Sequence, residues 1–233
     1  MQEDYSEECN AFYIGFSGGK DSMVLLDLCH KVLPLDVPVV FSDTDMELPD
    51  SHTTWEKVQE RYEGRTFLRV MADTPALETW RLFGPPSQAL RWCCSVHKST
   101  PAILALKERL GEKSIKPLAF VGVRGEESQR RAEYGDIGDG LKSQSQVNAM
   151  PILAWSSHEL WLYILEHKLL LNEAYRKGMS RVGCLMCPMS SARQNNMILL
   201  NYPDAVAPFA DAVRDTIDRE FSSDEDADAF VYE

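Results

Sequence analysis

The sequence contains no long hydrophobic run and no excess of positive charge. None of its apolar segments is long enough to cross a membrane, and residues 1–4 are polar and acidic, unlike a secretory leader. We therefore expect a cytoplasmic protein with no membrane partner. The formal net charge is −12, which argues against binding nucleic acid through the whole surface but leaves room for a local basic groove.

Internal repeats are also absent, and the composition is that of an ordinary globular protein. The 233 residues include 44% hydrophobic and 26% charged side chains, which suits one α/β domain with short extensions. Residues 1–11 are polar and predict a loose arm, and the acid-rich residues 218–233 predict a solubilising tail. We therefore expect a single domain over residues 12–217.

Residues 12–30 carry the strongest local signal. An apolar run at residues 12–16, the string S-G-G-K-D-S at residues 17–22 and an apolar helical pattern predict a strand, a tight loop and a helix start. Such a loop favours an anion through its backbone N–H groups and the helix dipole. Gly18 and Gly19 permit close approach of the backbone, and the side chains of Ser17, Lys20 and Ser22 add donors. A phosphate group is the predicted ligand, in preference to an ordinary turn with a solvated lysine.

The loop is not a Walker A loop, because the spacing G-x-x-x-x-G-K-[ST] does not occur in the sequence. It resembles the PP-loop of ATP pyrophosphatases, enzymes that cleave ATP between the α and β phosphates. Asp21 within it is a poor phosphate ligand, and we interpret it as a Mg²⁺ ligand or a helix-start acid.

Predicted strands alternate with predicted helices along the chain. The strands are expected at residues 12–16, 37–41, 66–70 and 118–123, and the helices at residues 49–62, 74–82, 100–110 and 155–171. This spacing predicts an α/β fold with a doubly wound parallel, Rossmann-like sheet and a helical region after residue 183. The polar residues 133–148 are expected to form a loop over the site.

Three polar segments follow predicted strands, at residues 17–22, 42–45 and 124–127. Because ligands of such sheets bind at the carboxyl ends of the strands, we expect these segments to form one site.

Six cysteines in a cytosolic chain are not expected to form structural disulfides. Cys29 lies within an apolar helical pattern and is predicted to be a buried small hydrophobe. The pairs Cys93-Cys94 and Cys184-x-x-Cys187 suit a redox pair, a zinc site or an iron–sulfur cluster. Adjacent cysteines diverge, so they fit the separated iron corners of a cluster more easily than one tetrahedral zinc.

Several segments together resemble the phosphoadenylylsulfate/adenylylsulfate reductase-like family. They run in order from residue 17 to residue 187 and include S-D-T-D at 42–45, R-W-C-C-S-V-H-K-S-T-P at 91–101, G-V-R-G-E-E-S at 122–128, P-I-L-A-W-S at 151–156 and G-C-L-M-C at 183–187. The resemblance implies an adenine nucleotide α-hydrolase-like fold. It also implies a [4Fe-4S] cluster held by Cys93, Cys94, Cys184 and Cys187, with Lys98 and His97 as candidate tuning cations.

Two departures from that family direct the functional prediction. The assimilatory reductases carry a C-terminal cysteine nucleophile, whereas no cysteine follows Cys187 here, and the intact G-G-K-D-S resembles ATP-cleaving relatives. The combination resembles the ATP pyrophosphatase components of DNA phosphorothioation systems, and it also echoes cluster-bearing tRNA thiolation enzymes. In this hypothesis ATP binds with adenine near Asp43 and Asp45, Mg²⁺ binds through Asp21, and Lys20, Asp21 and Arg124 are catalytic.

The same hypothesis names partners. A nucleic-acid acceptor would be adenylylated, and sulfur from a donor such as a cysteine desulfurase would displace AMP, with other subunits of a modification complex present. Arg130, Arg131 and Lys142 would line an acceptor channel or simply form a solvated loop. Glu126 and Glu127 would bind Mg²⁺ or orient Arg124, and we favour the second role. The alternatives are an adenylylsulfate reductase that borrows a cysteine, and a non-catalytic subunit that senses nucleotide and cluster.

Overall fold

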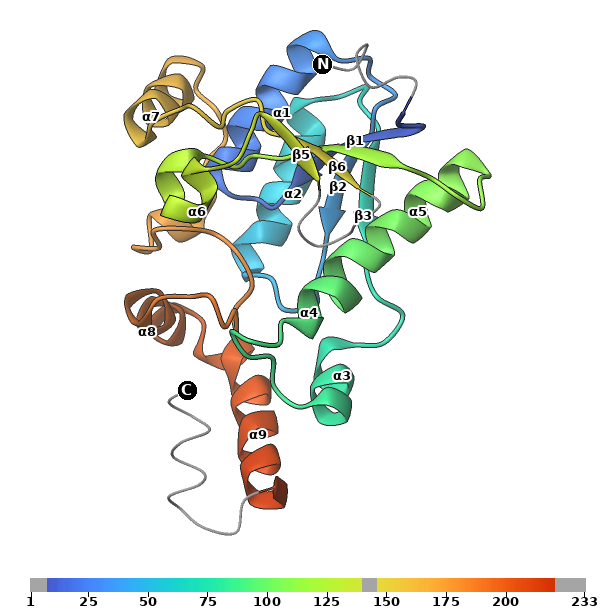
Figure 1. Cartoon of the computed structure of the whole chain (residues 1–233). Coiled ribbons are helices and arrows are strands. Elements are labelled where there is room, and N and C mark those ends of the chain that lie inside the picture. The colour runs from blue at the N-terminus through green and yellow to red at the C-terminus, as the bar shows by residue number, and fades with distance from the viewer. Residues whose placement is uncertain (1–7, 140–145, 221–233) are drawn as a thin grey trace.

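A six-stranded sheet with the order β3-β2-β1-β4-β6-β5 forms the centre of the computed structural model, which describes residues 8–139 and 146–220 (Figure 1). The strands are β1 (Ala11–Phe16), β2 (Val39–Ser42), β3 (Phe67–Val70), β4 (Pro117–Phe120), β5 (Ile137–Asp139) and β6 (Val147–Ala149). Within the described residues β5 alone runs antiparallel to its neighbour, and the other pairs are parallel.

Helices pack on both faces of this sheet. The helices are α1 (Lys20–Val32), α2 (Pro49–Arg61), α3 (Ala76–Phe83), α4 (Trp92–Cys94), α5 (Thr100–Leu110), α6 (Gln129–Ala132), α7 (Ser157–Glu166), α8 (Ala192–Asn201) and α9 (Pro203–Glu220). α1, α2 and α7 share one apolar core with the sheet, around the fully buried Ile14, Val24 and Leu118. α5 covers the opposite face through Ala102 and Leu106. The predicted doubly wound α/β fold is therefore confirmed.

The helices α3, α8 and α9 lie beyond the carboxyl ends of β1, β2 and β3, below the sheet in Figure 1. Trp80 of α3 packs edge to face against Phe209 of α9, with ring centroids 5.1 Å apart. A second small core joins the start of α2 to residues 174–206 through Leu48, Leu185 and Ile198. None of the helices in the described parts of the chain combines the length and apolar character that crossing a bilayer requires.

Two predictions of local structure are wrong. Residues 133–148 were expected to form a loop, but β5 lies within this segment and β6 begins at its residue 147, where short strands leave too few side chains for an alternating pattern. Residues 140–145 of the expected loop lie outside the described residues. The helix expected over residues 155–171 begins at Ser157, where Ser156 and Glu159 form a capping box, and ends at Glu166. It ends early because the backbone turns left-handed at Lys168, with φ of +47°.

Asp27 on α1 is a buried carboxylate that three helices share. It accepts hydrogen bonds from Tyr62 at 3.0 Å and Tyr163 at 2.7 Å, and it pairs with Lys31 at 2.8 Å. Burial alone would raise the pKa of Asp27, but the three donors outweigh burial and hold the pKa below its ordinary value. The charged carboxylate therefore stabilises the packing of α1 against its neighbours.

Arg65 closes the C-terminal end of α1. Its buried guanidinium donates to backbone carbonyls that follow or end the helix, those of Cys29, Leu33, Pro34 and Val37. The Cys29 carbonyl also accepts the backbone N–H of Leu33 at 2.8 Å, and the other three carbonyls lie beyond Val32, the last residue of the helix. The arginine therefore adds hydrogen bonds at a helix end, where carbonyls have fewer partners than in the helix interior.

Candidate functional site

The loop between β1 and α1 closes on itself through Ser22. The Ser22 hydroxyl donates to the Gly19 carbonyl at 2.9 Å and accepts from the backbone N–H of Ser17 at 3.2 Å. Gly18 sits at φ of +73°, a conformation that residues with a side chain rarely adopt, which explains glycine at this position. The strand, tight loop and helix start predicted for this stretch are present, and the first N–H groups of α1 face the loop.

Gly122 brings the end of β4 against the start of α1. A Cβ atom at Gly122 would lie 2.8 Å from the carbonyl carbon of Asp21 and 3.0 Å from the backbone nitrogen of Ser22. Both neighbours are backbone atoms, which cannot rotate away as a side chain can. Only glycine therefore allows the two strand-end segments to approach this closely.

Asp21 lies between two cations at the start of α1. Its carboxylate accepts from Lys20 Nζ at 2.8 Å and from Arg124 Nε at 2.6 Å. Burial acts to raise the pKa of Asp21, but the hydrogen bonds and charges of the two cations outweigh burial and lower the pKa. The structure thus brings together residues 17–22 and 124–127, as their positions after parallel strands predicted.

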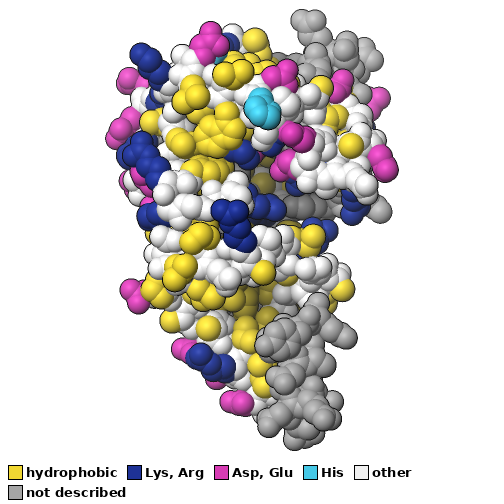
Figure 2. Space-filling view, turned by 90° about the vertical axis from the view of Figure 1, so that its left-hand side faces the viewer, with side chains coloured by type: hydrophobic (Ala, Val, Ile, Leu, Met, Phe, Trp, Pro, Cys, Tyr) yellow, Lys and Arg dark blue, Asp and Glu magenta, His cyan; other side chains and the backbone are white. Residues whose placement is uncertain are grey.

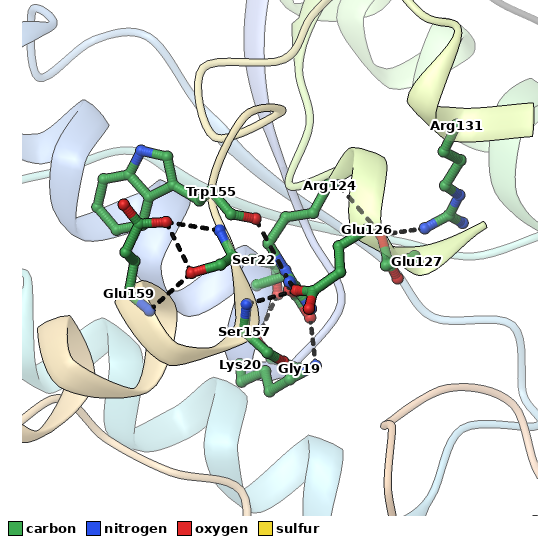
Figure 3. A network of polar contacts seen from close by, with 12 residues as sticks. Gly19, Lys20, Ser22, Arg124, Glu126, Glu127, Arg131, Trp155, Ser157 and Glu159 are labelled. Carbon is green, nitrogen blue, oxygen red and sulfur yellow. Dashed lines mark hydrogen bonds and ion pairs between the residues drawn. The ribbon is translucent and has the colours of Figure 1, made fainter. Parts of the chain in front are cut away.

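Two carboxylates hold Arg124 in place. Glu126 accepts from Arg124 Nη1 at 2.8 Å, and Glu127 accepts from the backbone N–H of Arg124 at 3.1 Å (Figure 3). Burial acts to lower the pKa of Arg124, but the surrounding carboxylates raise it, so the guanidinium stays charged. Glu126 and Glu127 orient the arginine, as expected from the sequence. Arg131 is paired with Glu127, whereas Lys142 lies outside the described residues.

The segment at residues 172–175 holds the loop from outside, and sequence reasoning missed it. Asn172 Nδ2 donates to the Gly18 carbonyl at 3.2 Å, and Tyr175 Oη accepts from the backbone N–H of Lys20 at 2.8 Å. More than 150 residues separate each pair, so no local pattern could have indicated these contacts. The local sequence offered one indication, which is that Asn172 is a residue type that caps helix starts, and here it caps the short helical turn at Glu173–Tyr175.

Asp43 and Asp45 lie at the end of β2, where both carboxylates are engaged within the protein. Asp43 accepts from Arg69 at 2.8 Å and contacts His52 at 3.0 Å, and Asp45 accepts from the backbone N–H of Ala76 at 3.1 Å. The two aspartates form one wall of a cavity of about 270 Å³, whose other lining residues include Met71, Thr74, Pro75 and His97. This cavity is separate from the contacts that join Asp21 to Arg124.

The four paired cysteines share one neighbourhood below the sheet. The pKa of the Cys93 thiol is raised by its hydrogen bond with Cys94, by burial and by the charges of Cys184 and Cys187. Cys93 and Cys184 also pack against the small core formed by α3 and α9. In the described parts of the chain, no three thiol, imidazole or carboxyl groups lie close enough to hold a single metal ion. Cys29 is buried elsewhere, on α1, as expected.

Cys184 is joined to the segment that follows β2. Its sulfur lies 3.5 Å from both Thr44 Oγ1 and Glu47 Oε1, and Glu47 in turn lies 3.5 Å from Lys98 Nζ. Burial and the nearby Glu47 raise the pKa of Cys184 to about 11, against the lowering effect of Lys98. The backbone of Cys184 also forms an antiparallel bridge with Glu47. The end of β2 therefore connects the cavity at Asp43 to the cysteines.

Comparison with known proteins identifies the family. The model of the phosphoadenosine phosphosulfate reductase domain matches residues 11–190, so the chain belongs to this family. A relative from Methanocaldococcus jannaschii is 34% identical over 203 residues, which are 87% of this chain and 41% of that protein. The adenosine 5'-phosphosulfate reductase of Halalkalibacterium halodurans is 29% identical and covers 73% of this chain and 71% of its own.

Solved structures show the same fold at lower identity. The phosphoadenylyl-sulfate reductase of Candida auris, solved as a phosphate complex, has a TM-score of 0.57 and 21% identity over 78% of this chain and 85% of its own. The FMN adenylyltransferase of Candida glabrata, with FMN and an ATP analogue, has a TM-score of 0.55 and 18% identity over 78% of this chain and 58% of its own. The chain spans about half the length of the two M. jannaschii relatives, 41% and 52%.

Proposed function

We propose that this protein is a nucleotide-binding enzyme that cleaves ATP to AMP and pyrophosphate at the loop of residues 17–22. The observation that carries the proposal is the arrangement at the start of α1, where Lys20, Asp21 and Arg124 meet within 2.8 Å contacts. Two cations beside a helix N-terminus stabilise the negative charge that develops as pyrophosphate leaves. A relative named as an adenosine 5'-phosphosulfate reductase and a neighbour solved with an ATP analogue support a nucleotide ligand.

The donor set suits Mg²⁺ as well. Asp21 offers the carboxylate oxygens that Mg²⁺ prefers, and Mg²⁺ is commonly held by one or two carboxylates together with substrate phosphates. Bound Mg²⁺ offsets phosphate charge. In the structure, Lys20 and Arg124 fix the position of Asp21. Once Asp21 binds the metal, each of the two cations would direct a donor toward phosphate oxygens.

The cysteine neighbourhood fits an iron–sulfur cluster better than one metal ion. A cluster spreads its ligands over separated iron corners, so the four thiols need not converge on one point. Two buried indole N–H groups, those of Trp80 and Trp92, lack a partner among the described residues and pack in the core that Cys93 and Cys184 contact. Buried donors normally find acceptors, and cluster sulfides are suitable ones. We propose that Cys93, Cys94, Cys184 and Cys187 hold a [4Fe-4S] cluster, which supplies a site for sulfur.

The proposed acceptor is a nucleic acid, as in DNA phosphorothioation, with a cysteine desulfurase as the sulfur donor. The overall charge is −12, but Figure 2 shows Lys and Arg side chains gathered at mid-height on one face. Phosphate backbones bind such local basic surfaces. Arg130, which is exposed on α6 beside the Arg124 segment, is a candidate contact.

The first experiment measures pyrophosphate and AMP released from ATP by anaerobically prepared protein. Lys20→Ala and Arg124→Ala are each expected to lower turnover by about 10²–10³-fold, the effect of losing one charge-stabilising donor. Arg214→Ala is a matched control, because Arg214 also forms a 2.6 Å pair with an aspartate, but on the exposed surface of α9. A protein that neither binds nor cleaves ATP would contradict the proposal.

A second candidate function is reduction of adenylylsulfate with a thiol from a partner. The relative that carries this activity in its name, from H. halodurans, favours it. Release of sulfite from adenylylsulfate in the presence of a thiol donor, without cleavage of ATP, would select this candidate over the first.

A further inference from the structure

Tyr175 brings an additional hydroxyl to the phosphate loop. Its Oη accepts the backbone N–H of Lys20 at 2.8 Å, and it lies 3.4 Å from the position that a Cβ of Gly19 would occupy. The phenol therefore stands directly over the first residues of α1. It reaches this position from the turn at Glu173–Tyr175, which Asn172 fastens to the same loop through Gly18.

The hydroxyl uses only its acceptor capacity in these contacts. A phenol has one O–H donor as well as acceptor lone pairs, and among the described residues its donor meets no protein acceptor. The hydrogen bond accepted from Lys20 polarises the O–H and makes it a stronger donor. Burial raises the pKa of Tyr175 above its ordinary value, so the proton stays on the oxygen at neutral pH.

The other side-chain donors near the loop already have partners in the protein. Lys20 Nζ and Arg124 Nε are both paired with Asp21, and the Ser22 hydroxyl donates to Gly19. A phosphate group must draw the two cations away from a carboxylate, whereas it can accept the Tyr175 O–H without breaking any contact described here. Among these side chains, Tyr175 is thus the donor most prepared for an anion, beside the backbone N–H groups of the loop.

We propose that Tyr175 is a phosphate-binding residue of the PP-loop site, donating its O–H to a phosphate oxygen while accepting the Lys20 backbone N–H. This inference rests on the proposed function, since it assumes that residues 17–22 hold the phosphates of a nucleotide. It assigns the contact to the phosphate part of the ligand and not to the nucleoside.

Tyr175→Phe tests this role, because it removes one oxygen and keeps the ring. The ring contacts with Trp161, at 5.9 Å between centroids, and with Lys20 Nζ, at 6.0 Å, are retained. Isothermal titration with inorganic pyrophosphate and with Mg-ATP is expected to show about tenfold weaker binding, the size of one lost hydrogen bond to a charged group. Adenosine, which has no phosphate, is expected to bind Tyr175→Phe and the unchanged protein equally.

Tyr62→Phe is the control for a merely structural tyrosine. This substitution also removes a hydroxyl, which donates to Asp27 at 3.0 Å in the core. It should lower the unfolding free energy and leave the affinity for pyrophosphate unchanged. Equal pyrophosphate affinity in Tyr175→Phe overturns the inference, as does tighter binding, which would mean that the phenol competes with phosphate for the Lys20 N–H. If the unchanged protein binds ATP and pyrophosphate, either result leaves the proposed function intact. If it binds neither, both proposals fail.

Discussion

Gly122→Ala is expected to strain the phosphate loop without replacing a charged residue. The added Cβ would lie 2.8 Å from the carbonyl carbon of Asp21 and 2.9 Å from its oxygen. Carbon atoms in favourable contact are about 3.5–4.0 Å apart, so one of the two segments must move by about 0.7 Å or more. Overpacking of this kind costs about 1–3 kcal/mol of unfolding free energy.

The displacement has a second consequence, because the atoms in the way are the first turn of α1. A shift of about 1 Å in a positioned group can reduce activity by about 10²-fold. We expect Gly122→Ala to lose Mg-ATP affinity or turnover to a degree that its loss of stability does not explain. Urea denaturation gives the change in unfolding free energy, and titration with Mg-ATP on the folded protein gives the change in affinity.

Gly138→Ala is the matched control, since a Cβ there meets only the flexible end of Met150, at 4.0 Å. We expect its unfolding free energy and its nucleotide affinity to stay close to those of the unchanged protein. Equal stability and equal affinity in Gly122→Ala would refute the reasoning, because they would show that the β4 end and the α1 start are not in rigid contact.

Asp27→Asn is expected to lower the unfolding free energy by about 1–3 kcal/mol at pH 7, because three donors lose their charged partner. Because the pKa of Asp27 is lower in the folded protein, this contribution is present above the unfolded pKa of about 3.9 and disappears as the pH falls through the folded pKa. The urea denaturation curves of the two proteins should therefore converge in acid. A difference in unfolding free energy that stays constant with pH would contradict this. Arg65→Lys should lower the unfolding free energy by about 2–3 kcal/mol and the melting temperature by about 4–12 °C, because one ammonium cannot serve four carbonyls; an unchanged melting curve would contradict it. Cys93→Ser should bleach the iron–sulfur absorbance of anaerobically prepared protein, and a colourless unchanged protein with one bound zinc would count against the cluster.

The repeating elements of the fold were predictable because their signals are local. Apolar runs at β1, β2 and β4 and helical patterns between them are properties of neighbouring residues, and so is the S-G-G-K-D-S string at residues 17–22. The meeting of Asp21 with Arg124 also followed, because parallel strands place their carboxyl ends on one edge. What could be foreseen was therefore the frame and the residues that follow its strands.

Contacts made by tertiary packing could not be foreseen. Tyr175 and Asn172 reach the loop from a segment that follows the helix α7 and not a strand. Glu47 reaches Cys184 across 137 positions of the chain. The prediction that Asp43 and Asp45 bind the nucleotide did not include Arg69 and the start of α3, which engage the two carboxylates. Periodicity describes which face of an element is apolar, but not which distant side chain will meet it.

The bridge between Glu47 and Cys184 also has a consequence for the order in which the protein acquires its site during synthesis. The sheet strands β1 to β4 leave the ribosome long before residues 172–187, which supply the contacts to the loop and the second cysteine pair. Domains tend to form from the N-terminus at about 5–20 residues per second. A nascent chain thus has time to build α1 before the second cysteine pair, Cys184 and Cys187, has been made. Chain growth itself delays both the contacts of Asn172 and Tyr175 with the phosphate loop and the completion of the cysteine site.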